Sequence, residues 1–168
     1  MAEVLPFPCC RPALDVASEV AAPPYDVMDR GEVAEEITRH PLSFLRIERP
    51  AALFPAEIDE SDAKVYERAG EILETDLQSG LLQVDAEPHY YVYRLDQSGR
   101  AQTGVVACAT IDDYLNGVIK RHENTRTEKE HDRICHIDTC NIQSSPVFLA
   151  HRPLDEIDKL IAAATQAT

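Results

Sequence analysis

The chain has 168 residues, the size of one ordinary domain, and its 44% apolar and 27% charged residues are typical of a folded globular protein. Its formal net charge of −14 repels nucleic-acid phosphates and anionic membrane surfaces, which argues against both kinds of partner. No stretch approaches the roughly eighteen apolar residues of a membrane span, and the first ten residues do not resemble a signal peptide. We therefore expect a single domain over residues 1–168, located in the cytoplasm.

The five cysteines support the same location. Their number is odd, and no secretion signal precedes them, so we expect reduced thiols rather than a disulfide framework.

The first half of the chain begins with a proline-rich stretch and continues into helical patterns. Residues 5–28 should be extended and irregular, because proline blocks helix interiors. Asp29, followed three residues later by Glu32, predicts the start of a short helix over about 31–39. The segment "SFLRIE" between two prolines predicts a strand. Apolar residues at helical spacing over 62–82, closed by Gly80, predict the most regular helix of the chain.

The second half mixes strands and helices. Residues 89–111 predict two strands joined by a turn at Gln97, Ser98 and Gly99. A helix should follow from Asp112, with Leu115, Val118 and Ile119 on one face. Further on we expect a helix from a Thr127–Glu130 capping box to about Cys140, a buried strand at "SPVFLAH", and a last helix opened by Pro153. This order predicts an α+β fold, with a small mixed sheet that includes a hairpin and is packed by about four to five helices.

Basic residues gather between positions 120 and 133 of this acidic chain: Lys120, Arg121, Arg126, Lys129 and Arg133. If a helix begins near Thr127, then Lys129, Asp132, Arg133 and His136 follow at i, i+3, i+4 and i+7 and form one stripe. Such side chains can hold an anionic ligand and move protons. The alternative is a solvent-exposed face with ion pairs between neighbouring turns.

Two histidine–cysteine pairs raise a second question in the same region. His131 with Cys135, and His136 with Cys140, have the i, i+4 spacing that lets two side chains share a metal on a helix. The two pairs point in different directions and no CxxC accompanies them, so the sequence predicts no metal site. A metal-binding regulatory domain stays a third hypothesis beside an enzyme and a binding module.

The motifs together resemble the N-terminal part of the domain of unknown function 1015 family of bacteria and archaea. The resemblance is carried by "PFPCCRP", "VAAPPYDVM", "SFLRIERP", "SPVFLAH" and, most specifically, "DYLNGVIKRHENTRTEKEHDR". It covers the chain from about Leu5 to Arg152. Members of this family are described as similar to free-serine kinases with a sulfiredoxin-like or ParB-like nucleotide-binding fold.

The resemblance implies a nucleotide-dependent phosphotransferase, or the N-terminal portion of one, with an anion site around residues 120–136. Phosphoryl transfer needs positive groups on the phosphates, usually with Mg²⁺, and a carboxylate or imidazole that places the hydroxyl. On this sequence it implies Arg126, Lys129 and Arg133 as phosphate-binding residues. His122, Glu123 and Asp132 are the implied catalytic residues, and ATP or ADP with Mg²⁺ is the implied cofactor.

Two differences from the family favour an alternative function. A "DGHHR"-like motif expected in the C-terminal part of family members does not occur in this sequence, and His151 stands where the family usually has a tyrosine. The alternative is a noncatalytic binding module that completes a site with a partner chain or a missing C-terminal half. This alternative predicts an exposed apolar surface on which that other polypeptide would dock.

Overall fold

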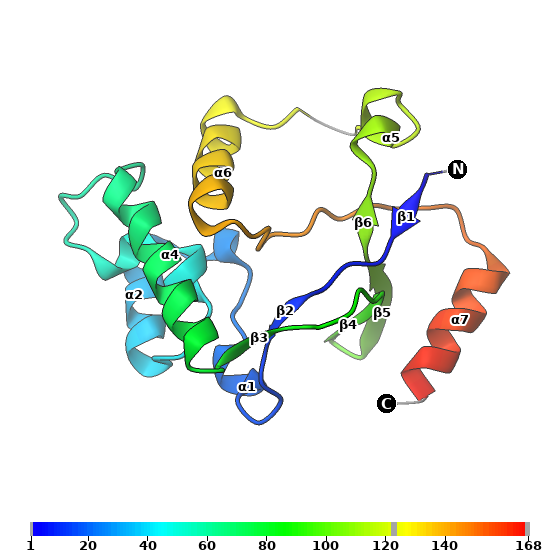
Figure 1. Cartoon of the computed structure of the whole chain (residues 1–168), viewed down its shortest axis with the longest axis horizontal. Coiled ribbons are helices and arrows are strands. Elements are labelled where there is room, and N and C mark those ends of the chain that lie inside the picture. The colour runs from blue at the N-terminus through cyan, green and yellow to red at the C-terminus, as the bar shows by residue number, and fades with distance from the viewer. Residues whose placement is uncertain (1, 122–123, 167–168) are drawn as a thin grey trace. The chain divides into compact units, whose positions relative to one another are not determined.

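The computed structural model describes residues 2–121 and 124–166, and these form two compact units. The helical unit comprises Cys10–Val84 and Thr125–Ser144, and the hairpin unit comprises Met1–Cys9, Asp85–Asn124 and Ser145–Thr168. The predicted α+β class is confirmed, because the described residues contain seven α-helices together with short strands (Figure 1). These strands form three separate two-stranded antiparallel sheets instead of the one mixed sheet that we expected. That residues 1–168 form a single domain stays a prediction.

The helical unit consists of five α-helices, two 3₁₀ turns and one pair of strands. The strands are β2 (Cys10–Pro12) and β3 (Leu82–Val84), which pair antiparallel. The helical elements are α1 (Ala17–Val20), η1 (Tyr25–Val27), α2 (Arg30–Arg39), α3 (Leu45–Glu48), η2 (Pro50–Leu53), α4 (Ala63–Gln78) and α6 (Thr127–Cys140).

Helices α2 and α4 begin and end where their sequences predict. Asp29 and Glu32 form a reciprocal capping box at the start of α2, with each side chain accepting from the other residue's backbone N–H. The Asp62 side chain accepts from the backbone N–H of Lys64 at the start of α4. Past the end of α4, Gly80 has φ +79°, a left-handed conformation that favours glycine and stops a helix.

The predicted strand at "SFLRIE" is wrong, because this segment forms helix α3. The backbone N–H groups of Ile47 and Glu48 both donate to the carbonyl of Phe44, at 2.9 and 3.0 Å. The flanking prolines suggested a strand, but α3 lies between two apolar clusters and supplies Leu45 to one and Ile47 to the other, so tertiary packing overrides this local signal.

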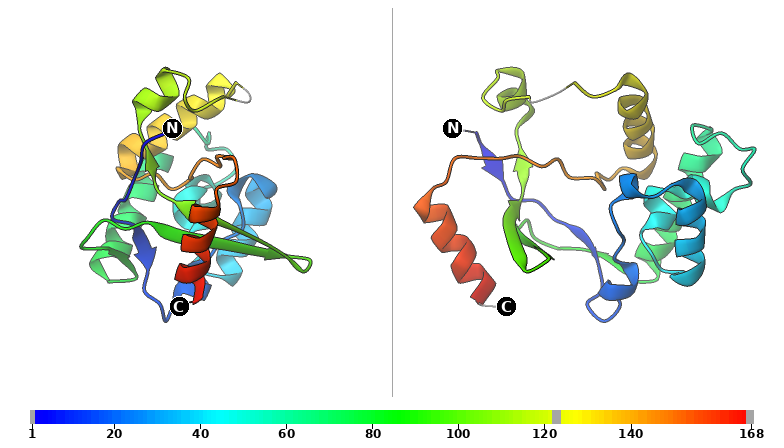
Figure 2. Two further views of the ribbon diagram at one scale, coloured as in Figure 1. Left: turned by 90° about the vertical axis from the view of Figure 1, so that its right-hand side faces the viewer. Right: turned by 180° about the vertical axis from the view of Figure 1, so that it is seen from behind.

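The hairpin unit is built around the predicted β-hairpin, which is confirmed. Strands β4 (Tyr91–Gln97) and β5 (Arg100–Val106) pair through a tight turn in which Ser98 and Gly99 both have positive φ. Strand β1 (Val4–Leu5) pairs with β6 (Cys108–Ala109), and helix α5 spans Ile111–Leu115. The predicted last helix is also confirmed as α7 (Asp155–Gln166), which contacts β4 and β5 (Figure 2).

Two predictions for the hairpin unit are wrong. The helix expected to include Val118 and Ile119 ends at Leu115, since Gly117 adopts φ +70° and turns the chain. The segment "SPVFLAH" forms no strand, and Phe148 is 79% exposed. An apolar run becomes a buried strand only where another strand offers backbone partners, and none of the described strands pairs with this segment.

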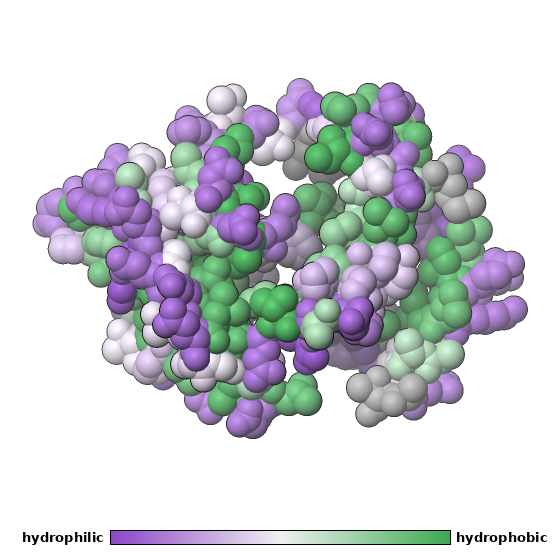
Figure 3. Space-filling view, viewed as in Figure 1, coloured by the Kyte–Doolittle hydropathy of each residue, from purple (hydrophilic) through white to green (hydrophobic). Residues whose placement is uncertain are grey.

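Burial is divided unequally between the two units. Every buried residue of the described chain lies in the helical unit, and most of its apolar members are distributed between the two clusters of that unit. In the hairpin unit apolar side chains reach the surface instead, and Figure 3 shows them over α5 and α7. None of the described helices has the length and apolar composition needed to cross a membrane.

The core position of Ile47 generates the first prediction. Ile47→Ala should lower the free energy of unfolding by about 2 to 5 kcal/mol, the usual cost of truncating a buried aliphatic side chain. Ile134→Ala is the matched control, because Ile134 lies half-exposed on α6, and its cost should stay near about 0.5 kcal/mol. Urea unfolding followed by far-UV circular dichroism measures both variants. Equal losses in the two variants would contradict the assignment of Ile47 to the core.

Candidate functional site

The candidate site lies on α6, whose bounds agree with the predicted helix. Its start differs in one respect, because Arg126 is the N-cap residue and no side chain caps the helix. Thr127 is already the first helical residue, so the predicted Thr127–Glu130 capping box is wrong. At the other end Asn141 adopts a left-handed conformation with φ 53° and terminates the helix.

The stripe that the sequence singled out is largely the side of α6 that packs inside the helical unit. Helix α6 contacts α4, and His136 is fully buried. Arg133 and Asp132 are partly buried, and only Lys129, one turn from the N-terminus, is exposed. Neither reading of the stripe anticipated this, because one made it a ligand site and the other a solvent-exposed face.

Arg133 is bound by two carboxylates. Its Nη1 donates to Glu48 Oε1 at 2.6 Å, and its Nη2 donates to Asp132 Oδ2 at 2.9 Å. Glu48 is 7% and Arg133 23% exposed, so this ion pair is largely withdrawn from water. Charge-assisted hydrogen bonds of this kind hold α6 against α3. They also occupy the guanidinium of Arg133, which the family resemblance implied as a phosphate-binding group.

Asp132 is also engaged on both of its oxygens. Tyr66 on α4 donates its hydroxyl to Asp132 Oδ1 at 3.0 Å, while Arg133 occupies Oδ2. Burial, followed by the hydrogen bond to Asp132, raises the pKa of Tyr66 above its ordinary value, so the hydroxyl stays protonated and keeps donating. The carboxylate implied as catalytic therefore links α4 to α6.

His136 is anchored to α3. Its Nε2 lies 2.8 Å from the carbonyl oxygen of Ile47, and because a carbonyl only accepts, Nε2 carries the proton. The neighbouring Cys140 is buried, and burial raises the pKa of its thiol to about 11. Both groups belong to the interior of the helical unit.

The remaining implied site residues lie at the surface or outside the described chain. Arg126 is 73% exposed and pairs with Glu128, itself 86% exposed, at 3.3 Å. Lys129 is exposed one turn further on. His122 and Glu123, the other two implied catalytic residues, lie outside the described residues. In the hairpin unit, Arg121 stacks over the Tyr114 ring at 5.1 Å and donates to Asn124.

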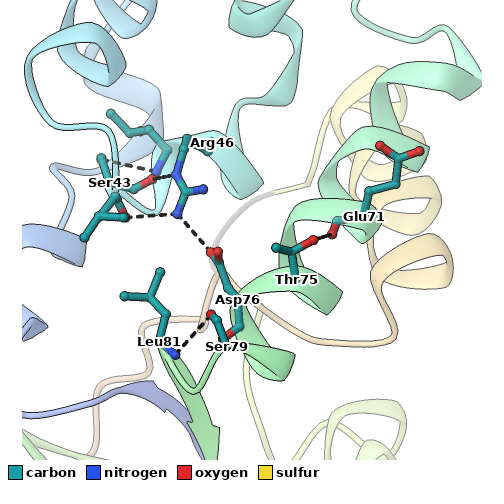
Figure 4. A network of polar contacts seen from close by, with 9 residues as sticks. Ser43, Arg46, Glu71, Thr75, Asp76, Ser79 and Leu81 are labelled. Carbon is teal, nitrogen blue, oxygen red and sulfur yellow. Dashed lines mark hydrogen bonds and ion pairs between the residues drawn. The ribbon is translucent and has the colours of Figure 1, made fainter.

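Local sequence patterns do not identify the partners that determine this arrangement. Glu48 and Tyr66 lie 85 and 66 residues before the side chains that they bind. A second largely buried ion pair, Arg46–Asp76 at 2.9 Å, joins α3 to α4 (Figure 4). Contacts between residues so far apart in the chain do not follow from local spacing.

The two histidine–cysteine pairs differ in their surroundings. The Nε2–Sγ distance is 3.7 Å in His131–Cys135 and 4.0 Å in His136–Cys140. The first pair lies on the exposed part of α6 and the second inside the unit. Within residues 2–121 and 124–166, no three histidine, cysteine or acidic side chains gather closely enough to hold a metal.

The Glu48–Arg133 contact generates the second prediction. Glu48→Ala should lower the free energy of unfolding by up to about 3 to 5 kcal/mol, because it removes the buried carboxylate from Arg133 and leaves only Asp132, whose side chain is 33% exposed. Glu128→Ala removes the same side chain from the exposed pair with Arg126 and should cost at most about 1 kcal/mol. Chemical denaturation of both variants at pH 7 tests this difference. A Glu48→Ala variant as stable as Glu128→Ala would show that the buried ion pair does not hold α6.

Comparison with known proteins identifies the family without adding a function. A family model described as a protein of unknown function (DUF1015) matches residues 4–168. No curated protein matches the chain. No solved structure matches it either. Since the match spans nearly the whole sequence, the chain belongs to the DUF1015 family of proteins of unknown function.

Proposed function

We propose that this chain is a noncatalytic binding module that completes a ligand site together with another polypeptide. The main observation behind the proposal is that the described buried residues all lie in one of the two units. None of the described residues of the hairpin unit is buried, whereas the helical unit holds two apolar clusters. A two-stranded hairpin is marginally stable in water unless further strands or helices cover its apolar face.

The apolar side chains of the hairpin unit are large and numerous enough to form an interface. At least a dozen are exposed, from the hairpin, α5, the extended segment after α6, and α7. The most exposed are Phe148, Val147, Ile111, Leu115 and Leu160. Large exposed apolar surfaces of this kind mark interaction sites on soluble proteins.

The partner that fits this surface is an apolar polypeptide that adds strands to the hairpin. Strands β4 and β5 pair only with each other among the described strands, so the outer edge of each offers backbone donors and acceptors. A second copy fits less well, because two chains that each carry a charge of −14 repel one another. The partner that we propose is therefore a different polypeptide, one that presents an apolar face and a strand edge to the hairpin.

The ligand that we propose for the completed site is the phosphate of a nucleotide such as ATP or ADP with Mg²⁺. Arg126 and Lys129 are exposed on one side of α6 and would contact it directly. Arg133 lies on the same side but is bound by Glu48, so its contribution would be to fix the helix. Glu128 and Glu130 in the first turn weaken the attraction of this helix end for anions, so this chain alone should bind nucleotide weakly and the partner should strengthen that binding.

Catalysis by this chain alone is less well supported than binding. A phosphotransferase needs a carboxylate or imidazole that is available to the substrate hydroxyl. Asp132 and His136 are both engaged within the fold. His122 and Glu123, the other implied catalytic residues, lie outside the described residues. In this proposal phosphoryl transfer belongs to the completed assembly. A cytoplasmic location is part of the same proposal and is supported by five cysteines that form no disulfide.

Titration calorimetry with ATP and ADP, with and without Mg²⁺, tests the proposal. We expect Mg²⁺-dependent binding that Arg126→Ala weakens by roughly tenfold, which corresponds to the loss of one charge-assisted contact. Arg39→Ala is the matched control, since Arg39 is an equally exposed arginine paired with acids on α2, and it should leave binding unchanged.

The same protein is then assayed for phosphate transfer from ATP to free serine. We expect no turnover by the isolated chain. Turnover would overturn the noncatalytic assignment and favour the phosphotransferase. No binding of either nucleotide, or equal weakening by the two arginine variants, would overturn the proposed phosphate contact.

A further inference from the structure

We propose that His131 and Cys135 form a two-ligand half-site for a thiophilic divalent cation, with Zn²⁺ the chemically best match. The two residues lie one turn apart on α6, a helix of 14 residues, so the helix backbone fixes their spacing. Their metal-binding atoms, His131 Nε2 and Cys135 Sγ, are 3.7 Å apart. Imidazole nitrogen and thiolate sulfur are the ligand types that Zn²⁺ prefers.

The distance between the two atoms agrees with a shared tetrahedral metal. Zinc binds thiolate sulfur at about 2.3 Å and imidazole nitrogen at about 2.0 to 2.1 Å, and a tetrahedral angle then places the two ligand atoms about 3.6 Å apart. The observed 3.7 Å needs almost no adjustment of either side chain. The half-site is therefore preorganised by the helix.

The surroundings of the pair leave it accessible. His131 is exposed and Cys135 is partly exposed. His131 lies two residues before Arg133, which places the two side chains on nearly opposite sides of α6 and directs His131 away from the packed stripe. Asp138 lies three residues after Cys135 on the same side, and its negative charge favours a bound cation, whereas the charge of Glu128 is paired with Arg126.

The second pair on the same helix, His136–Cys140, is not suited to bind a metal. His136 Nε2 donates to the carbonyl of Ile47, so this nitrogen is not available to a metal. Burial raises the pKa of the Cys140 thiol to about 11, which opposes formation of the thiolate that zinc needs. Both residues are buried. The His131–Cys135 pair differs from it in lying at the surface, with His131 exposed and Cys135 partly exposed.

The half-site supplies two of the four positions around a tetrahedral ion. No third histidine, cysteine or acid completes it among the described residues, so water or a ligand from outside fills the other two. Such a site binds zinc reversibly and leaves positions open for an external donor. Without a metal, the same geometry is an ordinary thiol–imidazole hydrogen bond. The experiment below distinguishes a metal half-site from a pair that forms only this hydrogen bond.

Site-resolved alkylation of the reduced protein under increasing Zn²⁺ tests the inference. Each of the five cysteines is followed by peptide mass spectrometry, so the protected thiol is identified directly. We expect zinc to protect Cys135 while the exposed Cys108 reacts at an unchanged rate.

Substitutions test whether the zinc protection of Cys135 depends on the His131–Cys135 pair. His131→Ala should raise the zinc concentration that half-protects Cys135 by about tenfold or more, since even an outer partner of a metal ligand is worth that much. His40→Ala, which removes an exposed histidine of the same unit, should change nothing. In a competition titration with a zinc-binding dye, Cys135→Ser should remove the same binding. Equal protection in His131→Ala, protection centred on Cys9 and Cys10, or no protection of any cysteine would overturn the inference.

Discussion

The contact between Glu48 and Arg133 is the interaction on which the arrangement of the helical unit depends. It joins a four-residue helix to α6 across 85 residues of sequence and is largely withdrawn from water. Two further contacts hold α3 in position. The Ile47 carbonyl accepts a hydrogen bond from His136 on α6, and Arg46 forms an ion pair with Asp76 on α4. A buried charge is costly without its partner, so these contacts favour one position of α6 over others.

This constraint explains why the basic segment does not act as one site. The stripe on α6 contributes Arg133, Asp132 and His136 to the packing of the helical unit and leaves only Lys129 at the surface, near the exposed N-cap residue Arg126. The charged and polar residues of the stripe thus position the helix. What is available to ligands is a pair of cations at one end of α6 and, on another side of it, a histidine and a cysteine.

The sequence predicted those elements whose signals are local. The capping box of α2, the apolar period of α4 and the turn at Ser98 and Gly99 each act within a few residues, and the structure confirms all three. The errors at α3 and at "SPVFLAH" have the opposite cause, since both segments depend on partners far away in the chain. The candidate site shows the same limit, because helical spacing identified the stripe on α6 but Glu48 and Tyr66 decide what it does.

We propose that the hairpin unit needs another polypeptide, since none of its described residues is buried. Amide hydrogen exchange of the isolated chain tests this claim most directly, since protection reports the free energy of local opening. We predict slow exchange in α4 and α6 and much faster exchange in β4, β5 and α7. Protection of β4 and β5 equal to that of α4 would contradict the account, because it would show that the hairpin unit is stable by itself.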